Sequence, residues 1–108
     1  MTMKDQTFGT EVEMFNISRE DAAKVAAKFF ETGRYTYIGG AYRTWSAYDQ
    51  QGREWKFEGD TSILSSDPEQ KCELVTPILK YEDIETLQEL LRQLRHAGAR
   101  SKPKAPAT

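Results

Sequence analysis

The first patterned segment of the chain, residues 8–15, alternates apolar with acidic side chains. Val12 and Met14 are interleaved with Glu11 and Glu13. Because successive side chains of a strand point to opposite faces, this pattern predicts a strand with one acidic face.

The second segment predicts a helix that begins at Arg19. Ser18 is a typical N-cap residue, and Gly33 is placed to close the helix after its last turn. Apolar residues recur on one helical face at spacings of three and four: Ala22, Val25, Ala26, Phe29 and Phe30. One side of this helix therefore packs on an apolar partner.

Two aromatic runs, residues 44–48 and 54–58, flank the polar stretch 49–52 and predict a hairpin. In the second arm, Trp55 and Phe57 share one face, and the charged residues that alternate with them point the other way.

The C-terminal part predicts a short strand and a helix. Residues 72–75 form the strand, which ends before Pro77 because proline cannot donate to a sheet. Asp83 can cap a final helix that ends near His96, with Gly98 just past it. Its apolar seam consists of Ile84, Leu87, Leu91 and Leu94, with Leu90 beside it.

This order of elements predicts an α+β fold, an antiparallel sheet with two helices packed on one face. The 108 residues leave room for one domain, which we place at residues 7–99. Residues 100–108 are basic and proline-rich, so we expect a disordered tail.

Composition argues against several classes of function. Fifteen Lys and Arg against seventeen Asp and Glu give a net charge of -2, which disfavours a nucleic-acid partner. Cys72 and His96 are each the only residue of their type, which excludes an intramolecular disulfide and a Cys/His zinc site. We find no secretory signal and no apolar run long enough to span a membrane, and we expect a cytoplasmic protein.

Acidic residues are the sharpest candidates for chemistry. Glu11 and Glu13 point the same way, roughly 7 Å apart. If that face is covered, their hard oxygens suit Mg²⁺ or Mn²⁺, whereas on an ordinary solvated strand they need no cation. Glu73 lies between Cys72 and Leu74, so it is either exposed or held by a partner.

Other candidates have two interpretations each. Asp60 could serve a site or make a local turn with its own backbone. Arg43 and Lys56 could bind phosphate or carboxylate, or they could be surface charges. Cys72 lies in an apolar strand, which favours a buried, inert thiol over a nucleophile.

Three motifs occur in order along the chain. They are Phe-Gly-Thr-Glu-Val-Glu at 8–13, Trp-Lys-Phe-Glu-Gly-Asp-Thr-Ser-Ile at 55–63 and Glu-Leu-Val-Thr-Pro-Ile-Leu at 73–79. In order and spacing they resemble the opening segment of the amidoligase family. That family belongs to the carboxylate-amine ligases, which share the fold of glutamine synthetase and glutamate-cysteine ligase.

The resemblance implies part of a glutamine synthetase-like catalytic fold. It also implies ATP-dependent joining of a small-molecule or peptide carboxylate to an amine through an acyl phosphate. Glu11, Glu13 and Glu73 would bind Mg²⁺, and Asp60 would lie in the same pocket as the candidate catalytic residue.

Under the same resemblance, Arg43 and Lys56 are the candidates for binding ATP. After Ala99, however, the family continues into a Cys-Gly-x-His-Val-His type strand, and this sequence contains no His-x-His. We therefore expect a truncated ligase domain that needs a missing C-terminal half or forms a homodimer. The alternative is a non-catalytic α+β binding or assembly module derived from the same fold.

Overall fold

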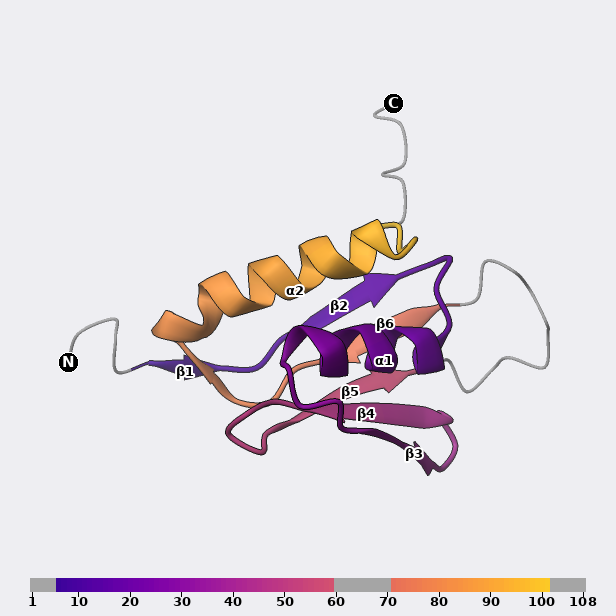
Figure 1. Ribbon diagram of the computed structural model, residues 1–108, viewed down its shortest axis with the longest axis horizontal. Helices are drawn as coiled ribbons and strands as arrows, with labels where there is room; N and C mark the ends of the chain where they lie inside the picture. The colour runs from indigo at the N-terminus through magenta and orange to yellow at the C-terminus, as the bar shows by residue number, and fades with distance from the viewer. Residues whose placement is uncertain (1–5, 60–70, 102–108) are drawn as a thin grey trace.

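The structure is a computed structural model and describes residues 6–59 and 71–101. Figure 1 shows two helices beside a sheet whose strands run along the long axis of the molecule. In chain order the elements are β1 (Thr7–Phe8), β2 (Glu11–Met14), α1 (Arg19–Phe29), β3 (Tyr35–Gly39), β4 (Thr44–Tyr48), β5 (Glu54–Glu58), β6 (Cys72–Val75), β7 (Leu79–Lys80), a 3₁₀ turn (Tyr81–Asp83) and α2 (Ile84–His96).

The main sheet has five antiparallel strands in the order β2-β6-β5-β4-β3. A second sheet of two strands pairs β1 with β7. Between the two sheets, Thr10 N–H donates to Thr76 Oγ1 and Thr76 N–H donates to Thr10 C=O, both at 3.0 Å. The α+β class with an antiparallel sheet and helices on one face is confirmed, and β6 ends before Pro77 as predicted.

The core lies between the sheet and the two helices. Trp55, Phe57 and Leu74 point from the sheet into this layer and are fully buried. Four buried alanines on α1 leave room for the large sheet side chains, because alanine adds little bulk to the helix surface: Ala22, Ala23, Ala26 and Ala27. Helix α2 closes the layer with Leu90 and Leu94.

The N-terminus of α1 follows the predicted capping. The Ser18 side chain accepts a hydrogen bond from Asp21 N–H at 3.0 Å. The helix ends at Phe29, and Gly33 lies beyond it with φ +62, a conformation that glycine adopts without strain.

The C-terminal end of the described chain returns to β2. Phe15 N–H donates to Arg100 C=O at 2.8 Å, and Arg100 N–H donates to Phe15 C=O at 2.9 Å. Asn16 Nδ2 donates to Gly98 C=O at 3.0 Å. This bridge lies one residue past the expected boundary at Ala99, and residues 102–108 of the expected tail lie outside the described residues.

A polar network ties the β4–β5 hairpin to the start of α2. Asp49 Oδ2 accepts from Arg53 Nε at 2.8 Å and from Trp55 Nε1 at 3.0 Å. The two terminal nitrogens of Arg53 donate to the two carboxylate oxygens of Asp83, at 3.0 and 3.2 Å. Asp83 also accepts from Lys80 N–H at 2.8 Å, so one guanidinium links two elements.

This network keeps both carboxylates ionised. Burial alone raises the pKa of Asp49, but the hydrogen bonds from Trp55 and Arg53 outweigh it, so the pKa lies below its usual value. The hydrogen bonds from Arg53 lower the pKa of Asp83 in the same way.

Replacing Arg53 with methionine tests this network. We expect Arg53→Met to lower the free energy of unfolding by about 2 kcal/mol, because it leaves a nearly buried Asp49 carboxylate without its counter-charge. In the matched control, Arg92→Met, the loss of the exposed ion pair with Glu89 should cost less than about 0.5 kcal/mol. Urea unfolding measures both variants, and equal losses would contradict the assigned role.

In the described part of the chain, neither α1 nor α2 has the length and hydrophobicity of a transmembrane span.

Candidate functional site

Glutamates from three strands lie on the face of the sheet opposite the helices: Glu11, Glu13, Glu54, Glu58 and Glu73. Glu13 of β2 is paired in register with Glu73 of β6, and Glu73 is paired in turn with Glu58 of β5. These three residues, the acidic row, cross three neighbouring strands. Glu11 lies on the same face, two positions before Glu13.

Strand geometry places these residues close together. Directly opposed residues of an antiparallel pair have Cα atoms about 4.5 to 5.5 Å apart. Like charges directly opposite each other destabilise a sheet. The row contains two such pairs, Glu13 with Glu73 and Glu73 with Glu58, so the fold keeps a charge arrangement that opposes its own stability.

Glu73 lies at the centre of this repulsion. Burial raises its pKa, and the negative charges of Glu11, Glu13 and Glu58 raise it further, while Lys71 acts in the opposite direction. Lys71 Nζ also pairs with Glu13 Oε2 at 3.1 Å.

A cation and a hydroxyl continue the same face toward β4. Lys56 of β5 is in register with Val75 on one side and with Ser46 on the other. Val75 is in register with Glu11, so Lys56 lies in the transverse line that starts at this glutamate. Ser46 is buried and donates from Oγ to Glu54 Oε2 at 2.7 Å.

The structure brings four of the six predicted site residues to this face: Glu11, Glu13, Lys56 and Glu73. Arg43 instead lies in the turn between β3 and β4, where it is exposed, has φ +50, and accepts a hydrogen bond from Arg19 Nε at its carbonyl. Asp60 lies outside the described residues.

Glu58 is a member of the row that the sequence did not single out. Its alternation with Trp55 and Phe57 places it on the polar face of β5. The sequence does not show how β5 pairs with β6. That register places Glu58 beside Glu73, although the two residues are distant in sequence.

Carboxylate oxygens of this kind are the donors that Mg²⁺ prefers. In the described part of the chain, however, no three Asp, Glu, His or Cys side chains are grouped closely enough to hold a metal ion. The donor atoms are therefore of the kind that suits Mg²⁺. Their positions, however, are those of a dispersed acidic surface.

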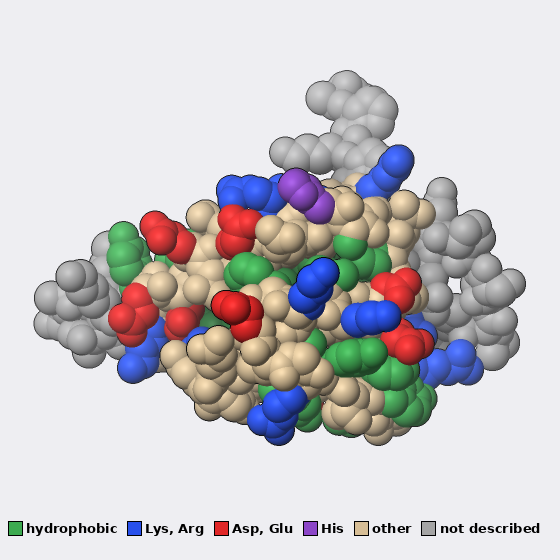
Figure 2. All heavy atoms as spheres, viewed as in Figure 1, with side chains coloured by type: hydrophobic (Ala, Val, Ile, Leu, Met, Phe, Trp, Pro, Cys, Tyr) green, Lys and Arg blue, Asp and Glu red, His purple; other side chains and the backbone are tan. Residues whose placement is uncertain are grey.

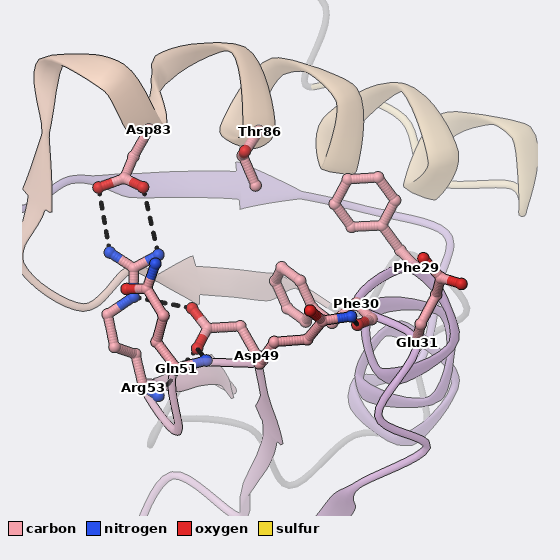
Figure 3. Close-up of a pocket in the computed structure, with 9 residues that line it drawn as sticks. Phe29, Phe30, Glu31, Asp49, Gln51, Arg53, Asp83 and Thr86 are labelled. Carbon is pink, nitrogen blue, oxygen red and sulfur yellow. Dashed lines mark hydrogen bonds and ion pairs between the residues drawn. The ribbon is translucent and has the colours of Figure 1, made fainter.

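A separate polar pocket lies between the end of α1, the β4–β5 hairpin and the start of α2 (Figure 3). Its volume is about 260 Å³. Figure 3 shows Arg53 between Asp49 and Asp83, so these three charged groups already form the network described above, while Glu31 on the opposite side of the pocket is not part of it. Gln50 Nε2, on its rim, donates to Phe30 C=O at 3.1 Å.

Cys72 is fully buried in β6, as predicted. Burial raises the pKa of its thiol to about 12, which disfavours the thiolate that a nucleophile needs.

The described residues thus define a class of α+β protein in which an antiparallel sheet has one helix-covered face and one open acidic face. A family model described as "Putative amidoligase enzyme" matches residues 4–107, and the chain belongs to this family. Searches of curated proteins and of solved structures found no match.

Replacing Glu73 with glutamine tests the repulsion within the acidic row. We expect Glu73→Gln to raise the free energy of unfolding at pH 7 by about 1 kcal/mol, because it removes both opposed like-charge pairs. Thermal unfolding measures the change. The matched control is Glu85→Gln on α2, which should lower stability by about 0.5 kcal/mol because it removes a negative charge from the first turn of that helix, an effect of opposite sign.

The pH dependence of this effect has a definite sign. The raised pKa lets folded Glu73 keep its proton at a pH where the unfolded chain has released it. The negative charge therefore lowers stability as the pH rises above the ordinary pKa of 4.5, and acidification toward that value restores it. The difference between wild type and Glu73→Gln should shrink on acidification, and a constant difference would contradict the repulsion.

Proposed function

We propose that this chain contributes the acidic face of an ATP- and Mg²⁺-dependent ligase that joins a carboxylate to an amine. The observation that supports it is the acidic row, in which Glu13, Glu73 and Glu58 oppose one another across three strands. Proteins keep such repulsive clusters where a bound cation or substrate offsets the cost. Membership of the amidoligase family agrees with this interpretation.

Glu11, Glu13 and Glu73 would hold Mg²⁺, with Glu58 beside them, once their side chains turn toward one another, because the sheet brings their backbones together while the side chains are dispersed. When bound, the ion would neutralise the phosphate oxygens of ATP. The half-buried position of Glu73 keeps its carboxylate close to the sheet surface, while the exposed Glu11 and Glu13 lie at the sheet edge.

The reaction class follows from carboxylate activation. A carboxylate oxygen of the substrate attacks the γ-phosphorus of ATP and ADP leaves, giving an acyl phosphate. The amine then attacks the acyl carbon, and phosphate leaves with formation of an amide bond. Lys56 would bind a phosphate oxygen from the same face, while the roles of Arg43 in ATP binding and of Asp60 in catalysis remain predictions from the resemblance.

The wider expectations belong to this proposal as well. They are a partial glutamine synthetase-like fold and a cytoplasmic location, where ATP is available and a single thiol stays reduced. The substrates would be a small-molecule or peptide carboxylate and an amine.

Calorimetric titration with Mg²⁺ and a non-hydrolysable ATP analogue tests the proposal. We expect wild type to bind the nucleotide only in the presence of Mg²⁺. Loss of one charged ligand costs about 1.5 to 3 kcal/mol, so Glu13→Gln and Glu73→Gln should each weaken binding by about tenfold or more. The control Glu85→Gln removes a carboxylate from α2 and should bind as wild type does.

If the folded wild-type chain does not bind the ATP analogue in the presence of Mg²⁺, this polypeptide does not contain the proposed Mg²⁺–ATP site. If wild type, Glu13→Gln and Glu73→Gln bind the nucleotide equally well, the binding site does not include the acidic row.

A second candidate function is a non-catalytic binding or assembly module. It is favoured by exposed apolar side chains that lie on β3 and in the turn after it: Tyr35, Tyr37, Ile38 and Tyr42. Self-association of wild type without any Mg²⁺-dependent nucleotide binding would favour this module over the ligase.

A further inference from the structure

Strand β3 forms one edge of the five-stranded sheet, and within residues 6–59 and 71–101 its only strand neighbour is β4. It lies at the outer margin of the molecule, on the side away from α2 (Figure 1). Its sequence, Tyr-Thr-Tyr-Ile-Gly, contains no charged residue and no proline. Charges and prolines are the usual means by which exposed sheet edges avoid pairing with another strand.

Apolar side chains of this edge face solvent. The exposed fraction is 54% for Tyr37 and 52% for Ile38. Figure 2 shows hydrophobic side chains gathered on the side of the molecule where β3 lies. The rings of Tyr35 and Tyr37 contact the Trp45 ring, with centroid distances of 6.1 and 5.3 Å. The aromatic side chains are therefore held in place before any partner binds, which lowers the entropy cost of association.

The register shows which backbone groups of β3 face outward. Tyr48 N–H donates to Arg34 C=O at 3.0 Å, just before the strand begins. Since hydrogen-bonded pairs alternate along an antiparallel ladder, Thr36 directs its N–H and C=O toward β4. Tyr35 and Tyr37 then direct theirs outward, so the edge offers two donors and two acceptors.

The opposite edge, β2, differs from β3 in its backbone hydrogen bonding and in its charge. Phe15, just past its end, already exchanges two backbone hydrogen bonds with Arg100. Glu11 and Glu13 precede Phe15 by even steps, so their backbone groups share its outward direction. A second β2 strand would oppose glutamate to glutamate, which is unfavourable.

We propose that β3 pairs antiparallel with β3 of a second copy of this chain, centred on Thr36. In this register Thr36 lies opposite the partner's Thr36, and Tyr35 lies opposite the partner's Tyr37. The outward groups then form four backbone hydrogen bonds around a two-fold axis. Thr–Thr and aromatic–aromatic cross-strand pairs are both favourable, so the edge is complementary to itself.

The irregularity between Tyr37 and Gly39 limits the regular segment to three residues per chain. The dimer is therefore weak and forms in proportion to concentration. The dimer joins the two sheets edge to edge and leaves the acidic row of each copy on the open face. The dimer proposal can therefore be confirmed or rejected independently of the proposed reaction.

Sedimentation equilibrium of the full chain tests the interface with charge substitutions at the two-fold axis. We expect wild type to show a reversible monomer–dimer equilibrium. Thr36→Lys and Thr36→Glu should each raise the dissociation constant by about fivefold, because like charges then oppose each other. An equimolar mixture of the two variants should recover at least the wild-type affinity, since opposite charges meet.

The control is Ile78→Lys, which places a lysine at a position with 66% exposure outside β3 and should leave the dissociation constant unchanged. Circular dichroism confirms that each variant folds. A wild-type chain that stays monomeric up to roughly 1 mM would overturn the proposal, as would a dimer that Thr36→Lys leaves unchanged.

Amide hydrogen exchange by NMR tests the same register in wild type without any substitution. The amides of Tyr35 and Tyr37 should exchange more slowly as concentration rises, while Thr36, already bonded to β4, should not change. A dimer in which Tyr35 and Tyr37 exchange at the monomer rate would assign the association to another surface.

Discussion

Alternation of side chains along β2, β6 and β5 couples the hydrophobic core to the acidic face. Leu74 and Phe57 point into the helix-covered layer, and their chain neighbours Glu73 and Glu58 must then point to the open side. A shift of one residue in register would bury the glutamates and expose the core, so the packing that stabilises the fold also fixes the acidic row.

The polar network at the other end of the sheet supports this register. Arg53 connects the β4–β5 hairpin with the start of α2, and within the hairpin Asp49 in the turn accepts hydrogen bonds from Arg53 and from the buried Trp55. The hairpin is therefore fixed at its turn by charge-assisted hydrogen bonds and along its arms by burial. The stability these contacts provide offsets the repulsion within the acidic row.

Local sequence patterns predict much of this fold because short-range physics sets it. The alternation around Val12 and the cap at Ser18 appear where expected. The apolar seam of the last helix is only partly as predicted, because Leu94 is buried but Leu90, placed beside the seam, is buried with it. The same alternation places Glu11 and Glu13 on one face. Pairing between distant strands has no local signal, and this is why Glu58 was missed as a neighbour of Glu73.

The same limit applies to the edge strand and to the polar network. No regular strand was predicted over residues 35–39, because Gly39 and Gly40 interrupt the aromatic run there. Asp49 lies in the predicted turn at 49–52 and Arg53 directly after it, and the link from Arg53 to Asp83 depends on where α2 begins in space. Arg43 was predicted to share a site with Lys56, but it lies in the turn between β3 and β4, away from the face that holds Lys56.

The central claim is that the acidic row is a cation site, and paramagnetic broadening of NMR signals by Mn²⁺ tests it most directly. Mn²⁺ shares the oxygen-ligand preference of Mg²⁺ and broadens the signals of nearby nuclei. The account predicts that Glu11, Glu13 and Glu73 on β2 and β6 lose their signals first, with Glu58 of β5 beside them, and that excess Mg²⁺ restores the signals. Broadening centred on Glu85 and Glu89 of α2, or no broadening at all, would contradict it.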